Sequence, residues 1–502
     1  MYELSVALGI LVLWLIPQAL SAEETISWDK AKELLISGKG LSDSPTLGEA
    51  VSNPKDYGAE ANPTGEPIGG GHGYSRIITS GNYTVGNRQE LLDALKKAKS
   101  GQIAYVKPDA EIDLTGLVNI HIPDGLVLAG NRGLDGAKGP LIFTDRIGQH
   151  PFPRIFIAGD KVRVTGLRFR GPDTDYADYI QEIKDAAYKI GARAIAAGTE
   201  SEIDNCEISN FYREGIAANV ANVYIHHNFL HDIAAYPVIV GGKVGTALIE
   251  ANIIHWGWHS IAGTGAPHTG YEARYNIFKP HTIPVAVFMH VSHCLDQHAY
   301  REAYHGREYN GLHIGGDYLN WHHNTIVLDG PSTSPDRTLG MKIRGTPQSL
   351  ARVYNNWLQT TSISQAIGPY GGPGEQAHGN LWIYNNVYGP KKQKLAAMLS
   401  RTTPQIHFKC PSPPGTTYDT YEKVGGVLKL DIEVNVINPL HLMGVVIKLD
   451  DKVLYLQPKA PRPGEIAIDT TKLSNGNHLL TVSAIDSRGA LGTQGVYIEV
   501  AN

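Results

Sequence analysis

Basic side chains that could act on an anionic substrate are concentrated between residues 290 and 344. Lys342 and Arg344 alternate with two apolar residues, and His313 stands between two others, which is the spacing of strands with one apolar face. We therefore expect these three side chains to point outward from a core. An arginine can grip a carboxylate with two parallel hydrogen bonds, a lysine can share that task, and a histidine can move a proton near neutral pH. The predicted chemistry is acid–base catalysis, with His313, Lys342 and Arg344 as catalytic residues.

A polar segment, Val291–Asn310, lies between two of the predicted strands. We expect it to form a loop beside the catalytic strands, because loops on a rigid scaffold are where function is usually placed. Its Tyr300 is a further candidate for the base, or for the acid that protonates a leaving oxygen. The residues assigned to substrate binding are His290, His293, His298, Arg301, Asp317 and Lys243.

The elements that must position these residues are short strands in a repeat. Asn228, Asn252 and Asn276 lie 24 residues apart, and Asn324 follows after 48, or twice 24. Each of these asparagines ends a short β-rich run. A repeat of this length that carries strands but no helix indicates a solenoid, here a parallel β-helix. We expect the asparagine to occupy a sharp turn of each coil, where it tolerates the left-handed conformation and can bond to the backbone of neighbouring coils.

The position of the asparagines also predicts the other strands of each coil. If each asparagine lies between the second and third strands, the first strands alternate inward apolar and outward residues. They are predicted at Gly215–Asn219, Pro237–Gly241, Ser260–Gly263, Val285–His290, Gly311–Gly315, Gly340–Arg344 and Ala366–Tyr370. The earlier of these strands carry no ionisable outward residue, so the chemistry is expected on the later ones.

Composition supports an all-β fold class. The 502 residues include 55 glycines, 29 prolines and 5 methionines, which favours many short strands with tight turns over a helical bundle. The net charge of −5 argues against wholesale binding of nucleic acid. The cysteines Cys206, Cys294 and Cys410 are too few and too scattered for a disulfide framework or a C-x-x-C zinc site, so we expect mostly free thiols. We expect the protein to be a monomer.

Residues 1–21 are predicted to be a signal peptide. An apolar run from Leu4 to Leu15 precedes Ala19 and Ser21, which have the small-x-small spacing of a cleavage site. The protein is therefore expected to be secreted or periplasmic. No later stretch approaches the roughly 20 apolar residues that a membrane span needs.

Three regions are predicted after the signal peptide. Residues 22–75 are a lead-in segment with one amphipathic helix, for which Ser27 is placed as the N-cap. Residues 76–411 form the β-helix, and a helix near its start is expected to cover the open end, as repeat proteins require. After the proline-rich run at 411–415 the pattern changes to alternating strands, so residues 416–502 are predicted to form a small β-sandwich.

The order of these segments resembles that of the pectate-lyase-like superfamily of right-handed parallel β-helices. The lead-in AYVKPDAEIDLTG is followed by GLVLAGNRG, by VRVTGLRFRG from Val162, and by HHNFLHD from His226. The resemblance implies a uronate polymer that lies along the first sheet and is cleaved by β-elimination. The tail from Tyr418 resembles the Ig-like modules appended to bacterial polysaccharide-degrading enzymes. In calcium-dependent pectate lyases Asp and Glu cluster on neighbouring first strands, whereas here Asp317 is nearly alone, so calcium stays an open alternative.

Elimination also suits the residue types. Removal of the proton α to a uronate carboxylate builds negative charge on that group, so the site needs cations and a base. A glycosidase usually needs two carboxyl groups that face each other, and near the proposed site the sequence offers only Asp317, Asp296 and Glu302. A polysaccharide lyase acting on an anionic polymer is therefore the expected function. A β-helix glycoside hydrolase and a non-catalytic glycan-binding solenoid are the alternatives.

Histidines raise the separate question of a metal. The chain has 21 histidines, and those that directly precede Asn228 and Asn324 recur with the coil, so they are placed on second strands, away from the site. His290 and His293 are the best pair for a metal, but no motif of the HExxH type supports one. No metal site is assigned.

Overall fold

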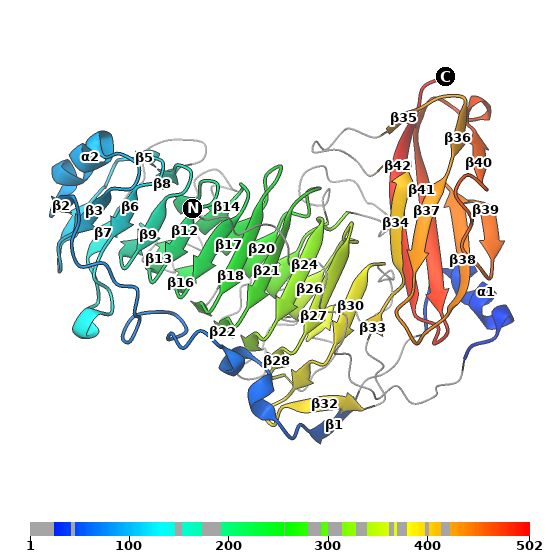
Figure 1. The fold of residues 1–502 in the computed structure, drawn as a ribbon, viewed down its shortest axis with the longest axis horizontal. Coiled ribbons are helices and arrows are strands. Elements are labelled where there is room, and N and C mark those ends of the chain that lie inside the picture. The colour runs from blue at the N-terminus through cyan, green and yellow to red at the C-terminus, as the bar shows by residue number, and fades with distance from the viewer. Residues whose placement is uncertain are drawn as a thin grey trace, which may run out of the picture.

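The computed structural model of the chain describes residues 25–41, 46–145, 153–172, 192–255, 257–279, 293–299, 314–327, 339–360, 366–368, 379–396, 401–412 and 422–502. These residues form a right-handed parallel β-helix followed by a β-sandwich (Figure 1). The predicted all-β fold class is confirmed. The predicted signal peptide lies outside the described residues, and so do His290, Tyr300, Arg301 and His313. Within the described ranges, no helix has the length and apolar character that crossing a membrane requires.

A complete coil contributes one strand to each of three sheets, which we name in the order in which the chain passes through them within a coil. The first sheet contains β5 (Ile120–Ile122), β8 (Arg154–Ala158), β11 (Arg193–Ala196), β14 (Glu214–Ala218), β17 (Tyr236–Val240), β20 (His259–Gly263), β23 (His293–Gln297), β26 (Leu339–Ile343) and β29 (Ile367–Gly368). The second sheet contains β2 (Tyr83–Val85), β3 (Ile103–Val106), β6 (Val127–Ala129), β9 (Arg163–Thr165), β12 (Glu202–Asp204), β15 (Val223–His226), β18 (Thr246–Glu250), β21 (Gly270–Arg274), β24 (Tyr318–His322), β27 (Leu350–Tyr354), β30 (Leu381–Tyr384) and β33 (Arg401–Thr402). The third sheet contains β4 (Glu111–Asp113), β7 (Leu141–Phe143), β10 (Arg168–Arg170), β13 (Glu207–Phe211), β16 (Phe229–Ile233), β19 (Ile253–His255), β22 (Ile277–Lys279), β25 (Thr325–Ile326), β28 (Trp357–Leu358), β31 (Val387–Tyr388), β32 (Gln393–Ala396) and β1 (Thr46–Ala50).

The core is built from residues in register on successive coils. On the first sheet one inward row runs through consecutive strands and is buried throughout; its members are Phe156, Ile195, Ile216, Val238, Ile261, Leu295, Met341 and Ile367. Each such side chain stabilises the fold by about 1.5–3 kcal/mol relative to an exposed one. Because side chains alternate along a strand, this row directs the intervening Asp296 and Lys342 to the outer face.

The asparagines form a buried ladder along the axis. Asn228 donates from its backbone N–H and from Nδ2 to Oδ1 of Asn252, at 2.9 and 3.0 Å, and Asn252 bonds to Asn276 in the same way. The left-handed turn falls on the residue before each ladder asparagine, as at His227 (φ 54°) and Ala251 (φ 53°). The prediction that the asparagine itself takes this conformation is therefore wrong, and its role is to satisfy buried donors and acceptors.

The interval of 48 residues before Asn324 holds one coil, not two. Asn276 donates directly to Oδ1 of Asn324 at 3.1 Å, so no coil lies between them. The first strand of this coil is β23, which pairs with β20 and β26 and was predicted as part of a loop. Of the predicted strand at Gly311–Gly315 only the last two residues are described, and there Ile314 makes an isolated bridge to Thr346. The predicted strand at Val285–His290 lies outside the described residues.

The lead-in segment runs the length of the β-helix (Figure 1). Its helix α1 (Trp28–Ser37) packs on the sandwich through Leu34 and Leu35, and β1 extends the third sheet at β32. Residues 51–76, which we call the strap, then run back along the turns that carry the asparagines. The strap bonds to coils in reverse order, as with Gly58 to Asn355 and Gly69 to Ala251. The cap at the start of the solenoid is instead helix α2 (Arg88–Lys97), as expected.

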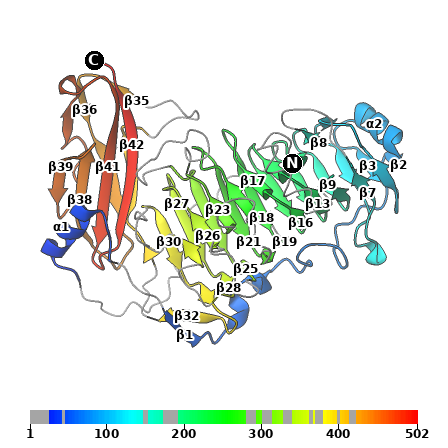
Figure 2. The same cartoon turned by 180° about the vertical axis from the view of Figure 1, so that it is seen from behind.

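The sandwich covers the other end of the β-helix (Figure 2). It contains β34 (Gln405–Cys410), β35 (Glu422–Val424), β36 (Val427–Lys429), β37 (Asp431–Asn435), β38 (Leu442–Leu449), β39 (Lys452–Gln457), β40 (Ala467–Asp469), β41 (Gly476–Asp486) and β42 (Leu491–Val500). Because β34 already pairs with β37, the sandwich begins before the predicted boundary at Pro411. Arg488 joins it to the last coil by donating from Nη2 to Oγ1 of Thr402 at 2.7 Å.

Candidate functional site

The candidate site lies on the outer face of the first sheet, on the adjacent strands β20, β23 and β26. Register places His259 beside His293 and Asp296 beside Lys342. Arg344 follows β26, and its backbone N–H donates to the carbonyl of Gln297 at 3.0 Å. Continued pairing of these strands past their ends therefore brings the side chains of three successive coils together.

Asp296 is the centre of this cluster and is completely buried. Arg344 donates to it from Nε to Oδ1 and from Nη2 to Oδ2, both at 3.1 Å. Nε2 of His298 lies 2.9 Å from Oδ2. Ring nitrogens of His259 and His293 lie 3.6 and 3.5 Å from the carboxylate. An arginine and three imidazoles thus surround one carboxylate.

Burial decides the charge state of the two inner histidines. His259 and His293 stack with ring centroids 4.8 Å apart, and their Nδ1 atoms lie 3.2 Å apart. Burial lowers the pKa of His293 to about 3 and the pKa of His259 well below its usual value, although Asp296 opposes both shifts. Both rings are therefore neutral near neutral pH.

Asp296 keeps its negative charge despite its burial. Burial alone would raise the pKa of Asp296, but the histidines and Arg344 around it lower that pKa well below its usual range. Burial also raises the pKa of the neighbouring Tyr236 to about 12. The cluster therefore contains one fixed carboxylate, one fixed guanidinium and the ammonium of Lys342.

The structure brings four of the predicted residues together, namely His293, His298, Lys342 and Arg344. His293 lies in a strand and not in the predicted loop. Asp317 lies in the turn before β24, where its backbone N–H donates to Thr269 O at 2.7 Å, and Lys243 is exposed in the turn after β17. Neither forms a hydrogen bond or ion pair with the cluster among the described residues. The other predicted site residues, His290, Tyr300, Arg301 and His313, lie outside those residues.

Sequence reasoning assigned no role to His259 and considered Asp296 only as a carboxylate for the alternative hydrolase, whereas the structure places both at the centre. A signal for both exists in the 48-residue interval between Asn276 and Asn324. If that interval is treated as one coil, His293 aligns with His259, and Asp296 falls on an outward position of the strand.

Within the described residues, two groups of side chains have the residue types of a metal site. His259, His293 and Asp296 have ligand atoms within 4.8 Å of one another. However, Nη2 of Arg344 lies 3.3, 3.4 and 3.1 Å from the same three residues, so a guanidinium cation occupies the position that a metal would take. Calcium needs about six to eight oxygen ligands, and this donor set has one carboxylate, already paired with an arginine. The cluster does not fit calcium.

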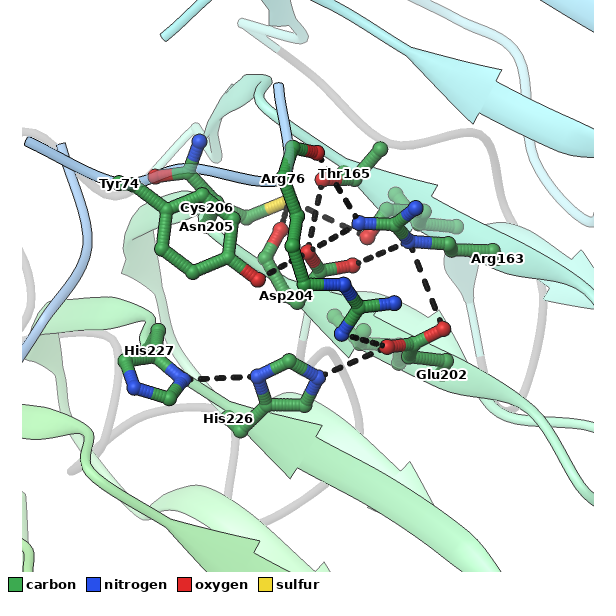
Figure 3. A network of polar contacts seen from close by, with 12 residues as sticks. Tyr74, Arg76, Arg163, Thr165, Glu202, Asp204, Asn205, Cys206, His226 and His227 are labelled. Atoms are coloured by element: carbon green, nitrogen blue, oxygen red, sulfur yellow. Dashed lines mark hydrogen bonds and ion pairs between the residues drawn. The ribbon is translucent and has the colours of Figure 1, made fainter. Parts of the chain in front are cut away.

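The second group is Glu202, Asp204 and His226 on the second sheet (Figure 3). Arg163 donates to both oxygens of Asp204, at 2.9 and 2.7 Å, and Tyr74 of the strap donates to it at 2.7 Å. Burial would raise the pKa of Glu202, but hydrogen bonds from neighbouring residues lower it to about 2. These carboxylates are already satisfied by arginines and tie the strap to the second sheet, which is a structural role.

Comparisons with known proteins add little to this geometry. No protein-family model matches the chain, and a search of curated proteins finds no match. Among solved structures, fibronectin(III)-like modules of Clostridium thermocellum CbhA are 20% identical with a TM-score of 0.15, over 19% of this chain and 96% of that chain. The endo-beta-1,4-mannanase from Thermotoga petrophila is 10% identical with a TM-score of 0.16, over 47% of this chain and 39% of that chain. These TM-scores are too low for either match to bear on function.

Proposed function

We propose that this protein is a secreted polysaccharide lyase that cleaves a uronic-acid polymer by β-elimination on the outer face of the first sheet. The observation that carries the proposal is that Arg344 and His298 contact one buried carboxylate, Asp296, and that Lys342 lies beside it in register on the next strand. Such a cluster supplies cations for a substrate carboxylate and an imidazole for proton transfer. The enzyme is proposed to act as a monomer, without calcium.

The charges of the cluster favour an anionic substrate. Asp296 and Arg344 neutralise each other, and His259 and His293 are neutral, while Lys342 adds a further cation on the same outer face. Lys342 points outward beside Asp296, and its side chain lies across Gly368 of the next strand. A uronate carboxylate placed over this part of the sheet would meet a positive potential.

β-Elimination is a reaction of the pectate-lyase-like superfamily, and the order of sequence segments in this chain resembles the order in that superfamily. The parallel β-helix and the sandwich after it fit that proposal, because Ig-like modules accompany many polysaccharide-degrading enzymes. The family also hosts hydrolases, so the fold alone does not decide the reaction.

The donor set disfavours a hydrolase. A glycosidase usually places two carboxyl groups across the scissile bond. In the described part of the first sheet, the cluster contains one carboxylate, and an arginine holds both of its oxygens. Asp296 is therefore unsuited to act as a general acid or as a nucleophile.

The experiment is a panel of pectate, alginate, ulvan, glucuronan and glycosaminoglycans, incubated with the purified protein with and without a chelator. Elimination creates a double bond conjugated with the carboxylate, and this group absorbs ultraviolet light. We expect such absorbance to appear on one class of polymer and to persist with chelator. New reducing ends without absorbance would indicate hydrolysis, and binding without product would indicate a glycan-binding solenoid.

A further inference from the structure

We infer that His298 is the base of this site, and that Asp296 is the positioning residue that fixes its tautomer. The inference rests on the proposed function, because it names the group that removes the proton in the proposed elimination. It replaces the assignment of this role to His313 or Tyr300.

The position of His298 is fixed from two sides. Its backbone N–H donates to Gly263 O at 2.9 Å, which continues the pairing of β23 with β20. Its ring meets the ring of His259 edge to face, at 5.4 Å between centroids and 73° between planes. The imidazole is therefore held by the sheet itself.

Asp296 determines which ring nitrogen carries the proton. Nε2 of His298 lies 2.9 Å from an oxygen of a carboxylate that is buried and ionised. Two lone pairs at that distance would repel each other, so Nε2 must carry a hydrogen. In the neutral ring the lone pair then lies on Nδ1, which has no hydrogen bond or ion pair to another described residue. A histidine oriented by a carboxylate in this way is the arrangement that general-base catalysis uses.

The other two imidazoles are unsuited to this role. The side chains of His259 and His293 are 0% and 6% exposed, whereas that of His298 is 12% exposed. Nitrogens of both inner rings also contact Nη2 of Arg344, at 3.3 and 3.4 Å. Of the three rings around Asp296, His298 is the most open to a substrate.

The proton balance of the step is simple. Nδ1 of His298 takes the proton from the carbon α to the uronate carboxylate. The electron pair of that C–H bond forms the new double bond as the bond to the leaving oxygen breaks. The leaving oxygen takes a proton from water, and the imidazolium returns its proton to solvent. Lys342 neutralises the carboxylate while charge develops on it, and no oxidant, reductant or metal is required.

The first test is chemical rescue of the variant His298→Ala. We expect kcat to fall at least about 100-fold with little change in KM, because a general base contributes about 10²–10⁴-fold. Added imidazole should restore part of that activity by filling the space that the ring leaves. His293→Ala is the matched control, since this ring also contacts the cluster but faces Arg344, and imidazole should not restore its activity.

The second test reads the tautomer without any substrate. Nuclear magnetic resonance of protein with nitrogen-15-labelled histidine should show the hydrogen of neutral His298 on Nε2, with His298→Gln used to assign the signal. In Asp296→Asn this preference should weaken and kcat should fall, without rescue by imidazole. Circular dichroism would check that each variant is folded. If Asp296→Asn does not fold, the tautomer measured in the wild-type protein still tests the proposal.

The outcomes separate the two proposals. An active wild-type enzyme whose His298→Ala variant keeps its kcat, or is not rescued by imidazole, would overturn the role of His298 and leave the lyase proposal intact. A hydrogen on Nδ1 in the wild type would overturn the positioning role of Asp296. Absence of unsaturated product from every polymer, with the Nε2 tautomer present, would count against the proposed function.

Discussion

Arg344 and Asp296 form a two-pronged ion pair on the outer face of the first sheet, with both hydrogen bonds at 3.1 Å. Asp296 is completely buried and the arginine side chain is 24% exposed, so the pair links a fixed interior charge to the surface. Arg344 was predicted to grip the substrate carboxylate. In the structure its Nε and Nη2 grip a carboxylate of the protein instead.

Arg344→Ala should therefore destabilise the protein as well as reduce activity. It leaves Asp296 buried without its main partner, and loss of one member of a buried ion pair costs about 3–5 kcal/mol. The free energy of unfolding from urea denaturation would measure this. Wild-type stability in Arg344→Ala would show that the pair is not structural, and wild-type turnover would remove Arg344 from the catalytic machinery.

Lys342→Ala should reduce activity and leave the stability of the protein almost unchanged. Lys342 lies on the outer face and is only partly buried, so we expect stability to change by no more than about 1 kcal/mol. Activity on the polymer should fall at least about 10-fold, because the cation that balances the developing charge is lost.

A matched variant at the next strand tests the position of this lysine. A Cβ added at Gly368 would lie 2.9 Å from Cδ of Lys342 and would push the side chain aside. Gly368→Ala should lower activity less than Lys342→Ala does. Equal activity of Lys342→Ala and wild type would contradict the role of the lysine, whatever Gly368→Ala shows.

Asn252→Ala should be among the most destabilising substitutions in the β-helix. It removes the acceptor for two donors of Asn228, both buried, and each unsatisfied buried group costs about 1–3 kcal/mol. Asn477→Ala, at an exposed position of the sandwich, should change stability by no more than about 0.5 kcal/mol. Thermal unfolding of the two variants side by side gives the comparison, and similar melting temperatures would mean that the ladder contributes little.

The sequence predicted the architecture well, because the asparagine period and the alternation of apolar residues act in every coil. It also predicted that Met341 and Ile343 point inward and leave Lys342 and Arg344 outside, and both apolar side chains are completely buried. These features are local and repeated, so a single sequence reveals them.

The centre of the candidate site could not be predicted for a physical reason. A 48-residue interval fits two coils of 24 or one coil with long excursions, and the period alone does not distinguish them. The choice of two coils placed Asp296 in a loop. The strap was missed because many of its contacts use the backbone, as where Gly69 N–H donates to Ala251 O, and its side-chain contacts, such as Tyr74 with Asp204, join residues far apart in the sequence.

Acid should destabilise the fold through two histidines of the asparagine turns. Burial, together with the histidine that precedes each of them, lowers the pKa of His227 and of His323 to about 4. The unfolded chain binds these protons at about pH 6.5. The part of the stability that depends on these two histidines is therefore fully present above pH 6.5, and it is lost as pH falls toward 4.

His323→Gln should reduce this acid sensitivity. Nε2 of His323 accepts a hydrogen bond from Asn355 at 3.1 Å, and a glutamine oxygen can accept it without titrating. Urea midpoints at pH 4 and 6.5 would measure the change. An unchanged difference between the two midpoints would show that His323 does not titrate as described.

Raising the pH should destabilise the fold through His231, whose pKa is raised and not lowered. Burial opposes its protonation, but Asp232 and Glu207 raise the pKa of His231 to about 9. The stability that protonated His231 contributes is fully present below pH 6.5 and is lost as pH rises through 9. His231→Gln should flatten stability between pH 6.5 and 9, and a variant that keeps the wild-type slope would contradict the assignment.

The most direct measurement of the central claim is digestion of the active polymer in water enriched in oxygen-18, followed by mass spectrometry. Elimination adds no water across the bond, so the unsaturated fragments should carry no label and each should be lighter by one water than a hydrolysis product. Lys342→Ala should give the same unlabelled fragments more slowly. Incorporation of oxygen-18 at the new chain ends would contradict β-elimination at this site.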